Sequence, residues 1–267
     1  MIFETHAHYD DSRFDEDRES VIEKVIDSGV SPIINVGASI ESTKTTLELA
    51  QTHEKIYAAV GVHPSDISDL NEESFAWLKE QCLNEKTVAV GEIGLDYYWD
   101  KEPEVQENQR IWFRRQMELA REVELPVIIH SRDAAADTMQ IMKEVNAKSQ
   151  SNIPGVVHCY SYSKDMALEF IKMGYYIGVG GVVTFKNAKK LVETVEAIPM
   201  ERILLETDCP YMAPEPNRGK RNDSSNIVYV IDKIAQIKNL SAAEVERTAE
   251  ENAYKLFKKI KNSCERG

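Results

Sequence analysis

The sequence predicts a (β/α)8 TIM barrel with an extra C-terminal helix, in a single domain over residues 1–267. Three observations support this α/β fold class. Short apolar, often β-branched runs alternate with longer amphipathic stretches, there are eight of each, and the length suits a barrel of about 250 residues. An open doubly wound sheet would use the same local signals. The count of eight strands favours the barrel.

The individual elements follow from periodicity and boundary signals. We expect strands at about 2–5, 32–36, 56–61, 87–91, 126–130, 154–158, 175–179 and 202–206. We expect helices near 16–28, 40–53, 71–84, 104–123, 133–147, 163–173, 187–197, 224–238 and 241–259. Gly29 ends the first helix, and Ser241 precedes Glu244 at the spacing of a capping box. The main irregular stretch is 209–223, which is rich in Pro, Asn and Gly.

Composition narrows the class of protein. The 267 residues include 45 acidic and 32 basic side chains, for a formal net charge of −13, and 42% are hydrophobic. Such a chain has the composition of a globular protein and not of a disordered one. The negative charge argues against a protein whose whole surface coats nucleic acid, although it leaves a local pocket open.

The sequence contains no expected membrane segment or signal peptide. Its longest apolar runs are far shorter than the ~20 residues of a spanning helix, and the N-terminal segment has no basic or apolar leader region. The four cysteines (Cys82, Cys159, Cys209 and Cys264) include no C-x-x-C pair. We therefore expect reduced thiols and a cytoplasmic location.

Histidines gather at the ends of the predicted strands. Five of the six lie at or just beyond a strand's carboxyl end: His6, His8, His63, His130 and His158. The exception, His53, ends a predicted helix. Active sites of parallel barrels form at this face, so five histidines there predict a shared site. His6 and His8 point to the same side of an extended strand and can reach one ion.

Carboxylates complete this set. Glu92 follows the fourth strand between Gly91 and Gly94, where it could bridge two ions, and Asp208 follows the eighth. Glu206 competes with Asp208 because it shares its parity, and we place it behind the ligands. Four imidazoles and two carboxylates exceed the needs of one tetrahedral zinc and suit two ions. The predicted metal ligands are His6, His8, Glu92, His130, His158 and Asp208.

Other catalytic motifs are absent from the sequence. It contains no G-x-S-x-G elbow and no Walker A motif, and Gly178–Gly181 lacks the third glycine of a dinucleotide fingerprint.

Seven short motifs extend over essentially the whole chain. They are Thr5-His6-Ala7-His8, Gly61-Val62-His63-Pro64, Gly91-Glu92-Ile93-Gly94-Leu95-Asp96-Tyr97, Ile129-His130-Ser131-Arg132, His158-Cys159-Tyr160-Ser161, Leu205-Glu206-Thr207-Asp208-Cys209-Pro210-Tyr211 and Arg218-Gly219-Lys220-Arg221-Asn222. In these motifs the chain resembles the TatD family of metal-dependent deoxyribonucleases, in the amidohydrolase superfamily.

The resemblance implies a barrel that holds two divalent ions (Zn²⁺, Mg²⁺ or Mn²⁺). It implies that His6, His8 and Asp208 bind the first ion, that His130 and His158 bind the second, and that Glu92 bridges them. It also implies hydrolysis of DNA phosphodiesters, including 3′→5′ trimming of single strands. A close relative within the superfamily would carry a carboxylated lysine where this chain has Glu92.

Three positions depart from the family pattern. Glu4 stands where the family usually has Asp, Tyr160-Ser161-Tyr162 replaces Phe-Ser-Gly after the sixth strand, and Asp223-Ser224 replaces an acid followed by proline. None of them is a predicted ligand. The last two lie on loops, so they bear on substrate preference.

We assign provisional roles to the remaining residues. Asp208 is the candidate general base, and His63 either contacts the phosphate, protonates the leaving group or is structural. The predicted phosphate-binding residues are Arg132, Arg218, Lys220 and Arg221, and the predicted base-stacking residues are Tyr97, Tyr98, Trp99 and Tyr160. Two alternatives stay open: an amidohydrolase or deacylase that acts on a small amide or ester, and a non-catalytic metal-binding regulatory protein.

Overall fold

The computed structural model describes residues 1–261, so Cys264 lies outside the described residues. Eight parallel strands form one sheet in the order β1 to β8, as in a TIM barrel. The strands are β1 (Ile2–Ala7), β2 (Val30–Val36), β3 (Ile56–Val60), β4 (Thr87–Asp96), β5 (Val127–Arg132), β6 (Gly155–Val157), β7 (Tyr176–Val179) and β8 (Ile203–Leu205). The predicted fold class is confirmed.

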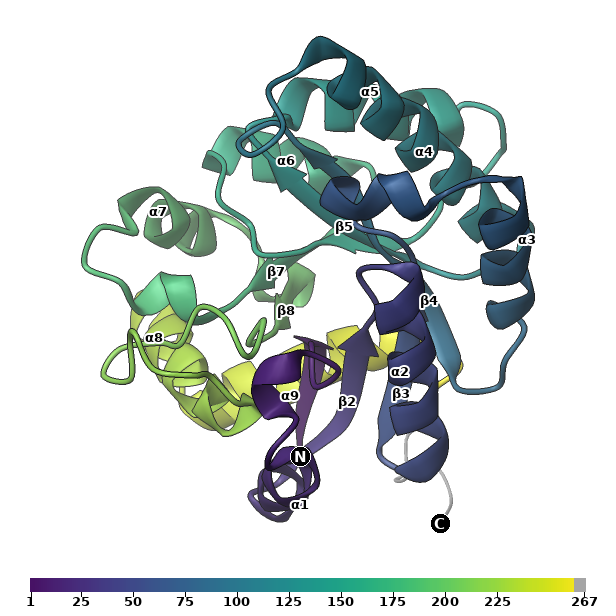
Figure 1. The fold of residues 1–267 in the computed structure, drawn as a ribbon. Coiled ribbons are helices and arrows are strands. Elements are labelled where there is room, and N and C mark those ends of the chain that lie inside the picture. Colours follow the sequence, from purple (N-terminus) through teal and green to yellow (C-terminus); the bar gives the residue numbers. More distant parts are fainter. Residues whose placement is uncertain (262–267) are drawn as a thin grey trace.

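Helices surround the strands, as Figure 1 shows. They are α1 (Arg18–Asp27), α2 (Ile40–Thr52), α3 (Glu72–Gln81), α4 (Pro103–Glu122), α5 (Ala135–Asn146), α6 (Lys164–Lys172), α7 (Lys189–Ala197), α8 (Ile227–Lys238) and α9 (Ala242–Leu256). Short 3-10 turns lie between them, among them η2 (Pro64–Asp69) and η3 (Gly181–Thr184). Within residues 1–261, no helix combines the length and the apolar character that crossing a membrane requires.

The extra C-terminal helix α9 closes the amino end of the barrel. Leu256, Phe257 and Ile260 belong to one buried cluster with side chains of the strands, including Phe3. Just beyond α9, Lys259 donates to the carbonyl of Thr87, the first residue of β4, over 2.8 Å. The carboxyl ends of the strands therefore stay free to build a site.

The seam between β1 and the segment after β8 closes the barrel. Ala7 forms a parallel bridge with Cys209. The His8 amide donates to the Cys209 carbonyl over 2.8 Å, and the Asp208 amide donates to the His6 carbonyl over 2.9 Å. An open doubly wound sheet would leave these edges apart, so the seam excludes that alternative.

The buried carboxylate of Glu4 fastens the seam. One oxygen accepts hydrogen bonds from the His6 amide (3.0 Å) and the Thr207 amide (3.1 Å), and the other accepts from the Thr207 hydroxyl (2.6 Å). Burial raises the pKa of Glu4 to about 7 despite these hydrogen bonds. Glu4 thus fixes the backbone on both sides of the seam, next to predicted ligands on each.

The fourth strand is longer than predicted. We expected it to end at residue 91, but β4 continues to Asp96, and Glu92 lies inside it. It continues because Ile93 to Asp96 pair in register with Ile129 to Arg132 of β5. Gly94 makes this possible: its φ is +150°, and a Cβ atom there would lie 1.9 Å from the carbonyl oxygen of His130.

Replacing Glu4 by Ala should weaken the seam. The change leaves the His6 and Thr207 amides without an acceptor in a dry interior, at a cost of roughly 1–3 kcal/mol for each unsatisfied group. We expect a loss of about 2–4 kcal/mol in the free energy of unfolding, measured by urea denaturation. Replacing the exposed Glu73 by Ala serves as the control. Equal stability of the two variants would contradict the role of Glu4.

Candidate metal centre

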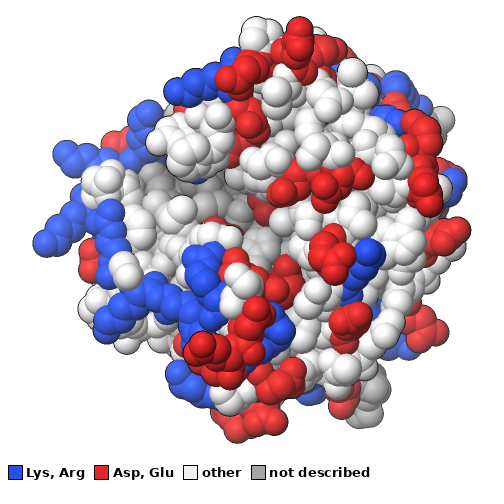
Figure 2. Space-filling model, viewed as in Figure 1, with Lys and Arg blue, Asp and Glu red and all other residues white. Residues whose placement is uncertain are grey.

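The six predicted metal ligands converge at the carboxyl end of the barrel. His6 comes from β1 and His8 from just beyond it, Glu92 comes from β4, His130 from β5, His158 from just beyond β6 and Asp208 from just beyond β8. All of them except the fully buried His6 line a cavity of about 590 Å³ that opens on this face, where Figure 2 shows a hollow. Within residues 1–261, groups of histidines and carboxylates here have donor atoms close enough to share an ion.

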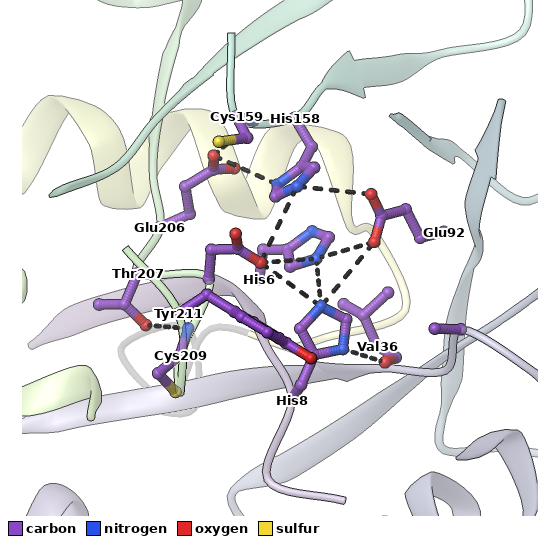
Figure 3. A network of polar contacts seen from close by, with 12 residues as sticks. His6, His8, Val36, Glu92, His158, Cys159, Glu206, Thr207, Cys209 and Tyr211 are labelled. Atoms are coloured by element: carbon purple, nitrogen blue, oxygen red, sulfur yellow. Dashed lines mark hydrogen bonds and ion pairs between the residues drawn. The ribbon is translucent and has the colours of Figure 1, made fainter. Parts of the chain in front are cut away.

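One oxygen of Glu92 faces the pair of histidines from the first strand. Its Oε2 atom lies 3.4 Å from His6 Nε2 and 3.8 Å from His8 Nε2. Asp208 Oδ1 faces the same two nitrogens at 3.9 and 3.5 Å. Figure 3 shows His6, His8 and Glu92 pointing toward one another. This is the first group of donors, and it brings together His6, His8 and Asp208, the residues that the family resemblance assigns to the first ion.

The other oxygen of Glu92 faces a second group of imidazoles. Its Oε1 atom lies 2.8 Å from His130 Nδ1, 3.4 Å from His158 Nε2 and 4.0 Å from His63 Nε2. His158 also stacks on His6, with ring centroids 3.6 Å apart, and so lies between the two groups. The carboxylate of Glu92 therefore joins both groups, which is the geometry of a bridging ligand.

The donor set fits divalent ions. The Nε2 atoms of His6 and His8 are 3.0 Å apart. Two nitrogens bound at 2.0–2.1 Å to one ion would be roughly 2.8–3.4 Å apart for angles of 90–109°. Imidazole donors suit Zn²⁺, and carboxylate donors suit Mg²⁺ and Mn²⁺. The residues present can therefore hold the ions that the family resemblance implies.

Hydrogen bonds from behind orient two of the imidazoles. His8 Nδ1 lies 2.8 Å from the carbonyl oxygen of Val36, and this contact leaves Nε2 free to bind an ion. His130 Nε2 lies 3.1 Å from Asp96 Oδ2. Asp96 is a functional residue that our sequence analysis did not assign. It lies four residues after Glu92 on the same strand, so period-two parity could have found it.

Glu206 lies behind His158; our sequence analysis placed it behind the ligands without assigning it to one of them. It is buried, and its Oε1 atom accepts a hydrogen bond from the Cys159 amide (2.6 Å) and lies 3.3 Å from His158 Nδ1. Gly178 provides the space, because a Cβ atom there would lie 2.3 Å from Glu206 Oε2. This arrangement is the carboxylate–histidine support seen behind many metal ligands.

The charges of the centre depend on one another. Burial alone would raise the pKa of Glu92, but His158, His130 and His6 outweigh it and hold that pKa well below its usual value. Burial alone would lower the pKa of His158, but Glu206 and Glu92 raise it to about 10. In the same way, Asp208 and other carboxylates raise the pKa of His8 to about 9 against burial. Without metal ions, protons on the imidazoles therefore balance the buried carboxylates.

His63 differs from His8 and His158 because its pKa is lowered and not raised. Burial, with His130 nearby, lowers the pKa of His63 to about 3, so its ring is neutral at neutral pH. Its Nδ1 atom accepts a hydrogen bond from the Ser65 amide, which leaves the ring proton on Nε2. Nε2 faces Glu92 and the cavity.

The structure brings one of the four predicted phosphate-binding residues into the cavity. Arg132 lines it, with its guanidinium 4.0 Å from the centre of the Tyr98 ring. Arg221 instead pairs with Asp17 over 2.6 Å, outside the lining. Arg218, which lies over the Phe185 ring, and Lys220 are exposed and also outside the lining.

Of the four predicted base-stacking residues, two line the cavity and two do not. Trp99 and Tyr160 line the cavity; Trp99 is 66% exposed, whereas Tyr160 is buried. Tyr97 uses its hydroxyl to donate to Asp137. Tyr211, which our sequence analysis did not select for stacking, lines the cavity with 44% of its surface exposed, and Figure 3 shows it beside His8.

Comparison with known proteins identifies the family. The model of the family described as TatD related DNase matches residues 3–258. The chain belongs to the TatD family. It is 45% identical to the metal-dependent hydrolase YabD of Bacillus subtilis, over 97% of this chain and 99% of that protein, and 30% identical to the metal-dependent hydrolase YcfH of Escherichia coli, over 96% of both.

A solved structure agrees. The TatD homologue YjjV of Escherichia coli superposes with a TM-score of 0.88 at 32% identity, covering 96% of this chain and 98% of that one. The protein is thus a metal-dependent hydrolase of the TatD family.

Replacing Glu206 by Gln should weaken the binding of metal ions. The amide cannot balance His158 electrostatically, and losing such a supporting carboxylate typically lowers metal affinity about 10- to 100-fold. Titration calorimetry with Mn²⁺ or Zn²⁺ would measure the change. The exposed Glu201→Gln serves as the matched control. If both variants bound metal like the unmodified protein, Glu206 would have no such role.

Metal binding should also depend steeply on pH. The pKa values of His8 and His158 in the metal-free protein are about 9 and about 10, so both rings are charged at pH 7 and must lose protons to bind an ion. Affinity should rise with pH through this range, with release of about two protons at pH 7, measured by calorimetry in buffers of different ionisation enthalpy.

The same pKa values set the sign of a stability effect. The pKa values of His8 and His158 in the folded protein lie above the usual 6.5, so protonation of these rings stabilises the folded state. This contribution to the free energy of unfolding is complete below pH 6.5 and is lost as pH rises through 9 to 10. Metal-free protein in a chelator should therefore unfold at lower temperature as pH rises from 7 to 10. A melting temperature independent of pH would contradict the charge balance.

Proposed function

We propose that the protein is a deoxyribonuclease that cleaves DNA phosphodiester bonds, trimming single strands in the 3′→5′ direction with two divalent ions. The observation that carries this proposal is the position of Glu92, with one oxygen toward each group of imidazoles at the floor of an open cavity. The family to which the chain belongs, described as TatD related DNase, supports the substrate class.

The first ion would be held by His6, His8 and Asp208, and the second by His130 and His158, with Glu92 shared. When bound, such a pair of ions supplies a water of lowered pKa and positive charge against the phosphate oxygens.

Two side chains of the centre, Asp208 and His63, would act on the water and on the phosphate. Burial would raise the pKa of Asp208, but His8, His158 and His6 hold it below its usual value, so the carboxylate is ionised and can accept a proton from the attacking water. His63 is neutral, so its Nε2–H suits a hydrogen bond to a phosphate oxygen better than transfer of a proton to the leaving group.

The mouth of the cavity suits a strand end. Arg132 lines the cavity and can reach a phosphate there, and its guanidinium is already positioned by the rings of Tyr98 and Trp99 at 4.0 and 5.6 Å. Trp99 on this side and Tyr211 on the other present exposed rings on which bases can stack. An amidohydrolase for small acyl substrates would have less use for a cavity of about 590 Å³ with stacking surfaces at its mouth.

Replacing Glu92 by Gln should abolish hydrolysis. Gln keeps the shape but removes the charge that both groups of donors share, so at least one ion should be lost. The assay compares 3′- and 5′-labelled single-stranded DNA, bis(p-nitrophenyl) phosphate and acyl-amino acids, each with Mn²⁺, Mg²⁺ or Zn²⁺. The exposed Glu102→Gln should retain full activity.

The substrates separate the proposal from its alternatives. Turnover of acyl-amino acids without DNA cleavage would replace the proposal with a deacylase, and bound metal with no turnover would indicate a regulatory protein. Full DNA cleavage by the Glu92→Gln variant would overturn the assigned centre.

A further inference from the structure

A strip of basic side chains lies beside the mouth of the cavity, outside its lining. It consists of Lys186, Lys189, Lys190, Arg218 and Lys220, all exposed. Figure 2 shows Lys and Arg gathered to the left of the hollow, over α7 and over the loop that precedes α8. We call these five residues the basic strip.

Contacts between two loops hold the strip together. The Arg218 guanidinium lies 4.2 Å from the centre of the Phe185 ring, just before Lys186. The Glu215 amide donates to the Thr184 hydroxyl over 2.9 Å. A Cβ atom on Gly181 would lie 2.1 Å from the Met212 carbonyl, so the two loops touch there. The strip is therefore one surface built from the loop after β7, the first turn of α7 and the loop after β8.

The same two loops form one wall of the cavity. Val182 and Met212 line it, and the strip begins four residues after the first and six after the second. A strand that leaves the cavity over this wall passes directly onto the strip.

The four lysines of the strip, Lys186, Lys189, Lys190 and Lys220, have no ion-pair partner among residues 1–261. Arg218 is the exception in the strip, because its guanidinium lies 3.9 Å from the Glu215 carboxylate. Lys189 and Lys190 also stand in the first turn of α7, which contains no acidic residue and where the helix dipole disfavours cations. In a chain of net charge −13, this local arrangement favours an anionic partner.

The opposite side of the mouth is acidic. Asp66 lines the cavity there, and Asp69 and Asp100 are close enough to raise its pKa further after burial. Figure 2 shows red side chains to the right of the hollow. A polyanion in the cavity is therefore repelled on one side and attracted on the other.

We propose that the basic strip binds the backbone of a single-stranded DNA tail, several nucleotides away from the bond that is cut. The proposal rests on the function proposed above. It assigns Arg218 and Lys220 to phosphates outside the cavity, together with three lysines that our sequence analysis did not select. It implies a fixed direction for the strand across the mouth and a preference for long substrates.

The test compares charge reversal on the strip with the same change elsewhere. The strip variant is K186E/K189E/K190E, and its control is K55E/K143E/K258E, three exposed lysines distant in sequence from the strip loops. Both variants have the same net charge. Acidic residues suit the first turn of α7, so the strip variant should fold, which circular dichroism would check.

Substrates of increasing length locate the effect. For the unmodified enzyme and the control, KM should fall as a single strand lengthens, and log(kcat/KM) should fall with log[salt]. In the strip variant the KM for a 20-nucleotide strand should rise about tenfold or more, and the salt slope should flatten by about 2, or roughly 0.7 for each lost contact. Activity on bis(p-nitrophenyl) phosphate, which is too short to reach the strip, should be unchanged.

Neutral methylphosphonate linkages at successive positions would then map the strip. Linkages that weaken binding to the unmodified enzyme and leave binding to the strip variant unchanged mark the contacted phosphates. DNA cleavage that is equal in the strip and control variants at every length would overturn this inference alone. Failure of the unmodified enzyme to cleave DNA would overturn the proposed function first.

Discussion

The charge of one buried carboxylate governs the centre of this protein. Glu92 is 4% exposed, and an unpaired carboxylate in such a place would cost several kcal/mol. Imidazoles face both of its oxygens, and in the metal-free protein several of them carry protons. Metal ions and protons can therefore neutralise the same negative charge within one set of donor side chains. We call this set the cage; it consists of His6, His8, Glu92, His130, His158 and Asp208. When a metal ion binds, it replaces protons on the imidazoles, so the donor side chains can keep their positions.

Two further buried carboxylates keep the cage in place. Glu4 lies at the seam and accepts hydrogen bonds from the backbone amides of His6 and Thr207, one on each side. These hydrogen bonds fix the position of the His6 backbone in β1. Glu206 lies behind His158 and accepts the Cys159 amide. Each carboxylate sits where the backbone supplies hydrogen-bond donors, so the cost of its burial is offset locally. The arrangement explains how three acids can lie close together in one small core.

The sequence predicted the strands and the six donors because both follow local rules. Apolar runs mark parallel strands, and a parallel barrel brings the carboxyl ends of its strands together, so His6 and Asp208 could be placed together from opposite ends of the chain. Contacts made by side chains at long range could not be predicted in this way. Arg221 pairs with Asp17, 204 residues away, and nothing in either neighbourhood indicates this. The extension of β4 to Asp96 depends on register with β5, which is also a property of the folded sheet.

The net charge of the protein and the charges beside the cavity act on a polyanion at different distances. A net charge of −13 repels a polyanion at long range, but screening shortens that repulsion to about 8 Å at physiological ionic strength. Within that distance the neighbouring groups decide, and these differ on the two sides of the mouth: Lys186 and Lys189 on one and Asp66 on the other. Under the binding that we propose, this asymmetry would orient a single strand without holding it tightly. A nuclease that releases its substrate after each cut would need that combination, because tight binding of the ground state slows turnover.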